Sequence, residues 1–135
     1  KRLSRYTQLE IVECADEKAP EELSDAMRAQ VKNAESARVL AHLGDADYAV
    51  ALTPGGKKLS SEAFAAMLDG LMTSGRSRVA FMIGGSLGLS DEALARADMK
   101  LSFSDMTFPH QLFRIMLLEQ IYRAFRIIRG EPYHK

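Results

Sequence analysis

The stretch RVAFMIGGSLGLSDEALARADMKLSFS, residues 78–104, decides the fold. Its first eight residues are an almost continuous apolar run that ends in a glycine pair, which predicts a buried strand. A loop and a short helix follow, with Ser90 as the helix cap and Asp91 and Glu92 in the first turn, where the helix dipole favours acids. Residues 99–104 predict a second strand. This order of strand, helix and strand is typical of an α/β fold with a mostly parallel sheet.

The flanking sequence continues the alternation of strands and helices. Apolar and β-branched runs predict strands at residues 8–15 and 47–52, and a turn-rich loop, TPGGKKLS, follows the second of them. Helical spacing of apolar residues predicts helices at 21–43, 60–75 and 109–129. The last helix carries an apolar stripe wide enough to cover more than one surface: Phe113, Met116, Leu117, Ile121, Phe125 and Ile128. We expect one domain over residues 1–135, because this length supports a single core.

Composition narrows the class of protein. The formal net charge is zero, which argues against binding nucleic acid through charge alone. No run approaches the roughly 20 apolar residues of a membrane span, and residues 1–10 lack the apolar core of a signal peptide, so we expect a soluble cytoplasmic protein. Cys14 is the only cysteine, which leaves no internal disulfide and no cysteine-based metal site. We expect it to be a buried strand residue.

The C-terminal segment departs from this neutral average. Between residues 109 and 135 the basic side chains outnumber the acids Glu119 and Glu131; they are Arg114, Arg123, Arg126, Arg129 and Lys135. Such a segment indicates a local contact with a polyanion, although a solvated helix face has the same composition. Glu119 and Arg123 stand four residues apart, a spacing that favours an ion pair along the helix.

Three loops with unusual chemistry follow predicted strands: LTPGGK at 52–57, IGGSLGLS at 83–90 and SFSDMTFPH at 102–110. Parallel sheets bind ligands at the carboxyl ends of their strands, so these loops predict a ligand site. The glycine loop matches neither a P-loop nor GxGxxG, and a plain tight turn would need the same glycines. His110 suits a catalytic role or a structural hydrogen bond. The tail GEPYHK could stack on a base, transfer a proton and contact a phosphate, or be a frayed end.

Together and in order, these segments resemble the RlmH (YbeA) family of SPOUT methyltransferases. The matching residues are ALTPGGK (51–57) with LSSEAFA (59–65), FMIGGSLGLS (81–90), LSFSDMTFPHQLFRIMLLEQIYRAFRI (101–127) and GEPYHK (130–135). The resemblance implies a SPOUT-type, mostly parallel sheet flanked by helices, with a deep C-terminal trefoil knot. It also implies a homodimer with the cofactor, S-adenosylmethionine, bound near the subunit interface.

The resemblance further implies N3-methylation of pseudouridine 1915 in 23S ribosomal RNA on the assembled ribosome. The cofactor positions carried over are Leu52, Gly85, Ser104, Asp105, Met106, Thr107, Phe108 and Pro109. We expect Tyr133, His134 and Arg123 to serve catalysis, with His134 or Tyr133 accepting the N3 proton. Arg114, Arg126 and Lys135 are the expected RNA contacts. No metal is expected.

Two other functions remain compatible with the residues. A catalytically idle knotted module could use the basic helix to dock on RNA, and its binding would be indifferent to S-adenosylmethionine. A nucleotide hydrolase would need a metal-binding acid, and Asp105 is the only acid inside the three loops. Members of the family carry an N-terminal strand, a loop and most of a helix ahead of KRLSRY, and we expect the molecule to possess them as well.

Overall fold

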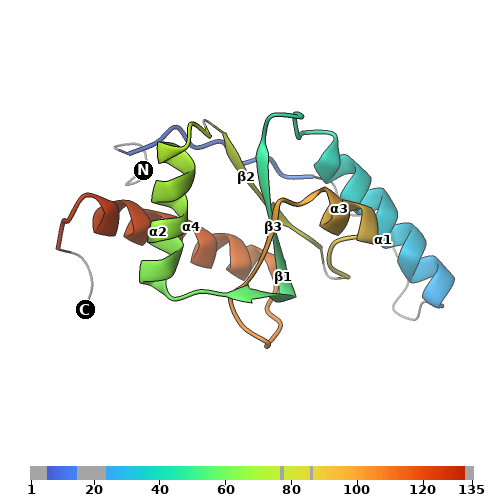
Figure 1. The fold of residues 1–135 in the computed structure, drawn as a ribbon. Helices are drawn as coiled ribbons and strands as arrows, with labels where there is room; N and C mark the ends of the chain where they lie inside the picture. The colour runs from blue at the N-terminus through green and yellow to red at the C-terminus, as the bar shows by residue number, and fades with distance from the viewer. Residues whose placement is uncertain (1–5, 15–23, 77, 86, 133–135) are drawn as a thin grey trace.

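The computed structural model describes residues 6–14, 24–76, 78–85 and 87–132, except for the side chain of His110. Figure 1 shows an α/β arrangement with helices on both sides of a small sheet. The elements in chain order are α1 (Asp25–Leu40), β1 (Tyr48–Lys58), α2 (Ser61–Thr73), β2 (Val79–Ile83), α3 (Asp91–Arg96), β3 (Met99–Ser102) and α4 (His110–Ile128). The strand order is β2-β1-β3, and both pairings are parallel, as predicted.

The central strand β1 faces a helical layer on each side. Ala49, Val50 and Ala51 are all fully buried. Val50 belongs to a core cluster with residues of α2 and α4, whereas its neighbours Ala49 and Ala51 pack in a second cluster with α3 and α1. Successive side chains of a strand point to opposite faces, so these three residues seal both faces of the sheet. An all-parallel sheet requires such cover on both faces.

A serine begins each of the first three helices. The side chains of Ser24, Ser60 and Ser90 accept hydrogen bonds from the backbone N–H three residues further on. Each cap satisfies a donor that the first helical turn would otherwise leave without a partner. The backbone N–H of Ser90 also donates to the buried Ser36 hydroxyl of α1 at 2.9 Å, which joins the start of α3 to α1.

Strand β1 is longer than the sequence predicted. The TPGGKKLS segment was expected to be a loop, but β1 continues to Lys58. Leu52 and Lys57 both pair with Leu101, so the residues between them form a bulge in the strand. A β-carbon at Gly56 would lie 2.7 Å from the backbone nitrogen of Leu101. Glycine is therefore required here because the two backbones approach too closely for a side chain.

The strand predicted at residues 8–15 is wrong for the part that the structure describes. Residues 7–14 have no regular secondary structure, and Leu9, Ile11 and Val12 are exposed. Among the described residues the sheet consists of β2, β1 and β3, and residues 7–14 pair with none of these strands. β-Propensity reflects packing against such neighbours and cannot form a strand alone. Cys14 is accordingly half-buried instead of buried in a strand.

The close approach at Gly56 predicts that alanine substitutions at the adjacent residues Gly55 and Gly56 differ in their effect on stability. We expect Gly56→Ala to lower the free energy of unfolding by about 2 kcal/mol, because β3 must shift to admit the methyl group. Gly55→Ala is the matched control, since a β-carbon at Gly55 meets nothing within 4 Å. Urea denaturation monitored by circular dichroism measures both. Equal destabilisation by the two substitutions would contradict the predicted contact.

Candidate functional site

The three segments singled out in the sequence meet at one level of the sheet: the bulge in β1 after Leu52, the glycine turn after β2 and the loop after β3. Leu52 of β1 is in register with Ile83 of β2 and with Leu101 of β3. Because all strands are parallel, their carboxyl ends share one edge of the sheet. The structure therefore brings Leu52, the glycine loop and the loop after β3 to the edge where such folds bind ligands.

The loop after β3, residues 103–109, is anchored on the first turns of α4. The ring of Phe113 lies 6.1 Å from that of Phe103 and 5.5 Å from that of Phe108, measured between centroids. Within the loop, the backbone N–H of Met106 donates to the Ser104 hydroxyl at 3.0 Å. The Met106 side chain stands at the tip and is 70% exposed. Aromatic packing thus fixes both ends of the loop and leaves its middle open to solvent.

An ion pair ties this loop to the end of β1. Lys58 Nζ lies 2.6 Å from Asp105 Oδ2, and both side chains are largely exposed. Asp105 is thus already neutralised by a lysine, which leaves it a poor metal ligand. Among the residues that the structure describes, no group of three or more His, Cys, Asp and Glu side chains could hold a metal ion. The hydrolase alternative therefore gains no support.

The glycine loop after β2 is a tight turn. The N–H of Gly88 donates to the carbonyl of Gly85 at 3.0 Å, and the two residues form an isolated bridge. A β-carbon at Gly84 would lie 2.5 Å from the carbonyl carbon of Gly88, so the turn closes directly on this glycine. A β-carbon at Gly85 would instead point at the Glu35 carboxylate of α1, 2.8 Å away. Both glycines belong to the turn that the sequence singled out, but only Gly85 was among the expected cofactor positions, and Gly84 is the more closely packed of the two.

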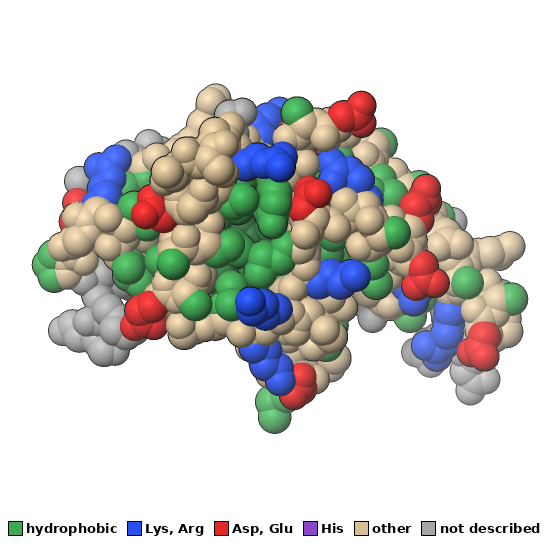
Figure 2. All heavy atoms as spheres, in the orientation of Figure 1, with side chains coloured by type: hydrophobic (Ala, Val, Ile, Leu, Met, Phe, Trp, Pro, Cys, Tyr) green, Lys and Arg blue, Asp and Glu red, His purple; other side chains and the backbone are tan. Residues whose placement is uncertain are grey.

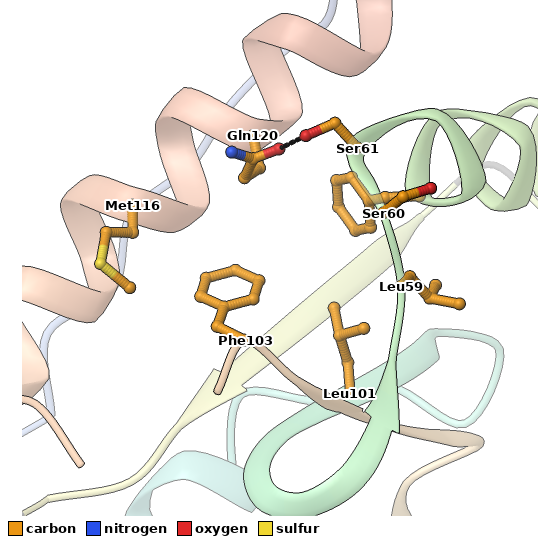
Figure 3. A pocket seen from close by; sticks show the side chains of 8 residues that line it. Leu59, Ser60, Ser61, Leu101, Phe103, Met116 and Gln120 are labelled. Atoms are coloured by element: carbon orange, nitrogen blue, oxygen red, sulfur yellow. Dashed lines mark hydrogen bonds between the residues drawn. The ribbon is translucent and has the colours of Figure 1, made fainter. Parts of the chain in front are cut away.

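A pocket of about 260 Å³ adjoins the loop after β3. It lies between α2, α4 and the ends of β1 and β3, and Figure 3 shows Phe103 and Leu101 facing Met116 and Gln120 across it. At its rim the Ser61 hydroxyl donates to Gln120 Oε1 at 2.7 Å. On the face drawn in Figure 2, hydrophobic side chains gather in a hollow bordered by lysines and arginines.

Sequence reasoning did not predict this pocket. Ser61 appeared only within the matched segment 59–65 and Met116 only as part of the apolar stripe, while nothing singled out Gln120. Their association depends on how α2 packs against α4, which no local pattern reveals.

The expected RNA and catalytic arginines all have acidic partners within the chain. Arg123 lies 3.3 Å from Glu119, which confirms the predicted pair along the helix. Arg114 lies 3.2 Å from Glu13, and Arg126 lies 3.5 Å from Glu131; the atoms measured are a guanidinium nitrogen and a carboxylate oxygen. The arginines therefore do not form an unscreened basic patch. Tyr133, His134 and Lys135 lie outside the described residues, as does the side chain of His110.

The remaining expected cofactor residues occupy the loop after β3. Ser104 and Phe108 are half-buried, whereas Asp105, Thr107 and Pro109 are exposed. The backbone N–H groups of Thr107 and Phe108 donate to no acceptor among the residues that the structure describes. This edge thus combines open backbone donors, a hydroxyl and apolar surface. Such a combination suits a small ligand with a planar ring.

No helix in the described part of the chain is long and apolar enough to cross a membrane.

Residues 1–134 match a family model described as "Predicted SPOUT methyltransferase". The chain is 59% identical over 135 residues to the ribosomal RNA large subunit methyltransferase H of Listeria monocytogenes, covering all of this chain and 85% of that protein. Proteins of the same name from Listeria welshimeri and Bacillus thuringiensis are each 58% identical with the same coverage. The chain therefore belongs to the RlmH family of SPOUT methyltransferases.

Proposed function

We propose that this protein is an S-adenosylmethionine-dependent methyltransferase that modifies large-subunit ribosomal RNA. Its target in this proposal is N3 of pseudouridine 1915 in 23S ribosomal RNA, on the assembled ribosome. The relatives named as ribosomal RNA methyltransferases support the substrate class. The observation that carries the proposal is the common level of Leu52, Ile83 and Leu101, where the bulge in β1, the glycine turn and the loop after β3 meet at one edge of the sheet.

The residues at this edge fit the cofactor. An adenine ring needs apolar walls and backbone hydrogen-bonding groups, which Leu52, Phe108 and the open N–H of Thr107 offer. Ser104, Asp105, Met106 and Pro109 complete the stretch in which we propose it binds, and Gly84 joins Gly85 as a candidate from the glycine turn. When bound, S-adenosylmethionine supplies an electrophilic methyl group.

In this proposal the chain accelerates the reaction mainly by positioning the RNA base against the methyl donor. Methyl transfer needs the accepting nitrogen aligned with the donor, and correct alignment supplies much of the rate. N3 of a pseudouridine carries a proton at neutral pH, and we propose that His134 or Tyr133 accepts it, with Arg123 orienting the base. Arg114 and Lys135 are the proposed phosphate contacts. Arg114 must then exchange Glu13 for a phosphate, which makes binding sensitive to salt.

The family also leads us to propose a trefoil knot, a homodimer and a cytoplasmic location. The dimer is supported by Leu112 and Ile115 of α4, which are 40% and 62% exposed although they are large and apolar. A twofold-symmetric interface would bury such side chains against the same surface of a second copy. The ribosomal substrate proposed above supports the cytoplasmic location.

Cofactor and substrate can be tested together. We expect the protein to bind S-adenosylmethionine in isothermal titration and to transfer a labelled methyl group to assembled ribosomes, with little transfer to naked ribosomal RNA. Reading the modified position by mass spectrometry identifies the nucleotide. RNA binding that ignores the cofactor, without methyl transfer, would establish the idle RNA-binding module instead.

The Lys58–Asp105 pair yields a second prediction. Lys58→Met should release the loop after β3 and weaken S-adenosylmethionine binding about two- to fivefold, the scale of an exposed ion pair. Lys57→Met removes the same charge from the same strand, yet Lys57 contacts no carboxylate among the described residues, so it is the matched control. Isothermal titration compares the two dissociation constants. Equal affinities in both variants would show that the ion pair does not order the cofactor loop.

The tail provides a third prediction. Deleting residues 133–135 should leave S-adenosylmethionine affinity nearly unchanged but lower the methylation rate on ribosomes roughly 100-fold, the scale of positioned acid–base catalysis. Loss of cofactor affinity in this variant would assign the tail to the cofactor site. An unchanged methylation rate would remove Tyr133 and His134 from the mechanism.

A further inference from the structure

The end of α4 turns the chain back over the last helical turn. Gly130 has a φ of +70°, the left-handed conformation that glycine adopts readily. Its N–H donates to the carbonyl of Ile127 at 3.0 Å, and the N–H of Glu131 donates to the carbonyl of Arg126 at 2.9 Å. These two bonds form a Schellman motif, which brings Glu131 and Pro132 back beside the helix.

Side chains then hold the reversed segment in place. The Tyr6 hydroxyl donates to Glu131 Oε1 at 2.6 Å, across a separation of 125 residues in the sequence. Arg126 Nη2 donates to the carbonyl oxygen of Pro132, also at 2.6 Å, while its Nε lies 3.5 Å from Glu131 Oε1. We call Tyr6, Arg126, Glu131 and Pro132 the C-terminal clasp. Its hydrogen bonds hold Glu131 and Pro132, the two residues immediately before Tyr133.

The Tyr6 ring is itself fixed by α4. It stacks on Phe125 with centroids 5.7 Å apart and meets the edge of Tyr122 at 6.0 Å. The guanidinium of Arg129 lies 4.8 Å from its centroid, within the range of a cation–π contact. Because the ring packs independently of its hydroxyl, the hydroxyl reaches Glu131 from a rigid base.

Charge keeps the clasp closed. A hydrogen bond with the Tyr6 side chain is the main cause that raises the pKa of Arg126, with smaller contributions from Tyr122 and Glu131. Arg126 therefore stays cationic at every pH of interest and continues to face the Glu131 carboxylate. With its guanidinium bonded to Pro132 and close to Glu131, Arg126 is less suited to the phosphate contact that the sequence suggested.

We propose that Tyr6, Arg126 and Glu131 are positioning residues that set the direction in which the chain leaves α4. Through this direction they place the residues after Pro132 for the RNA-side step of methyl transfer. The inference rests on the proposed function, and it gives Tyr6 a role in the reaction. None of the three residues needs to touch the cofactor or the base.

The sharpest test is Tyr6→Phe in the full chain, because it removes the hydroxyl and keeps the stacked ring. We expect kcat for ribosome methylation to fall about 10-fold, the scale of a hydrogen bond to a charged group, with KM and cofactor affinity nearly unchanged. Glu131→Ala should have a similar effect, whereas Glu131→Gln should recover part of the rate because its amide oxygen still accepts from Tyr6. Tyr48→Phe is the matched control: this half-buried tyrosine also lies beside an arginine, Arg76, but far from the clasp in the sequence.

Two further measurements separate positioning from a general structural effect. In a chain that lacks residues 133–135, Tyr6→Phe should cause no additional loss of kcat, because the clasp acts only through those residues. In the intact chain it should accelerate amide hydrogen exchange at Glu131 without changing exchange in the sheet.

The outcomes are distinct. Suppose that the unsubstituted protein methylates ribosomes and that the tail deletion slows methylation, but that Tyr6→Phe changes neither kcat nor amide exchange at Glu131. The positioning role of the clasp is then overturned, and the proposed function stands. An equal further loss of kcat in the tail-deleted chain also overturns it, since the effect would not pass through the tail. Absence of methylation by the unsubstituted protein would overturn the proposed function and, with it, the role of the clasp.

Discussion

Parallel pairing of β1 between β2 and β3 is the constraint on which the rest of this structure depends. It aligns Leu52 with Ile83 and Leu101, so the bulge in β1, the glycine turn and the loop after β3 meet at one edge of the sheet. It also occupies both edges of β1, and a helical layer covers each face, so the small or β-branched residues at positions 49–51 are fully buried. A shift of one residue in β1 would exchange its two faces and separate the loops from one another.

The site edge is shaped by close backbone contacts more than by side chains. Gly56 lies against the backbone of β3, and Gly84 lies against Gly88, at distances that admit no β-carbon. Close packing of this kind leaves peptide groups, and few side chains, at the site edge. The side chains that do act here, such as Lys58 and the Phe103 ring, fix how the loop after β3 sits on β1 and α4.

Local patterns predicted the helices well because each carries its own signal. Ser60 and Ser90 mark starts that the structure confirms, and the apolar stripe of α4 lies where its spacing indicated. The failures concern strands, which depend on partners. Residues 8–15 have strand composition but no neighbouring strand, and TPGGKKLS has loop composition but continues β1 because β3 pairs with Lys57 and Lys58. The resemblance supplied the cofactor positions, which periodicity and composition could not have done, whereas the charge of the C-terminal segment suggested the arginines expected at the RNA.

Contacts between distant residues account for what the sequence could not reveal about the arginines of α4. The basic C-terminal segment suggested an open surface for a polyanion, yet Glu13 and Glu131 pair with two of these arginines from outside the helix. In the proposed RNA contact a phosphate has to compete with those carboxylates, which favours selectivity at the expense of affinity. Arg126 differs from Arg114 because it also holds the carbonyl of Pro132, and a guanidinium engaged with both a carboxylate and a backbone oxygen is difficult to recruit. Two arginines on one helix are thus held differently, because Arg114 contacts Glu13 in the N-terminal segment whereas Arg126 contacts Glu131 and Pro132 after the helix.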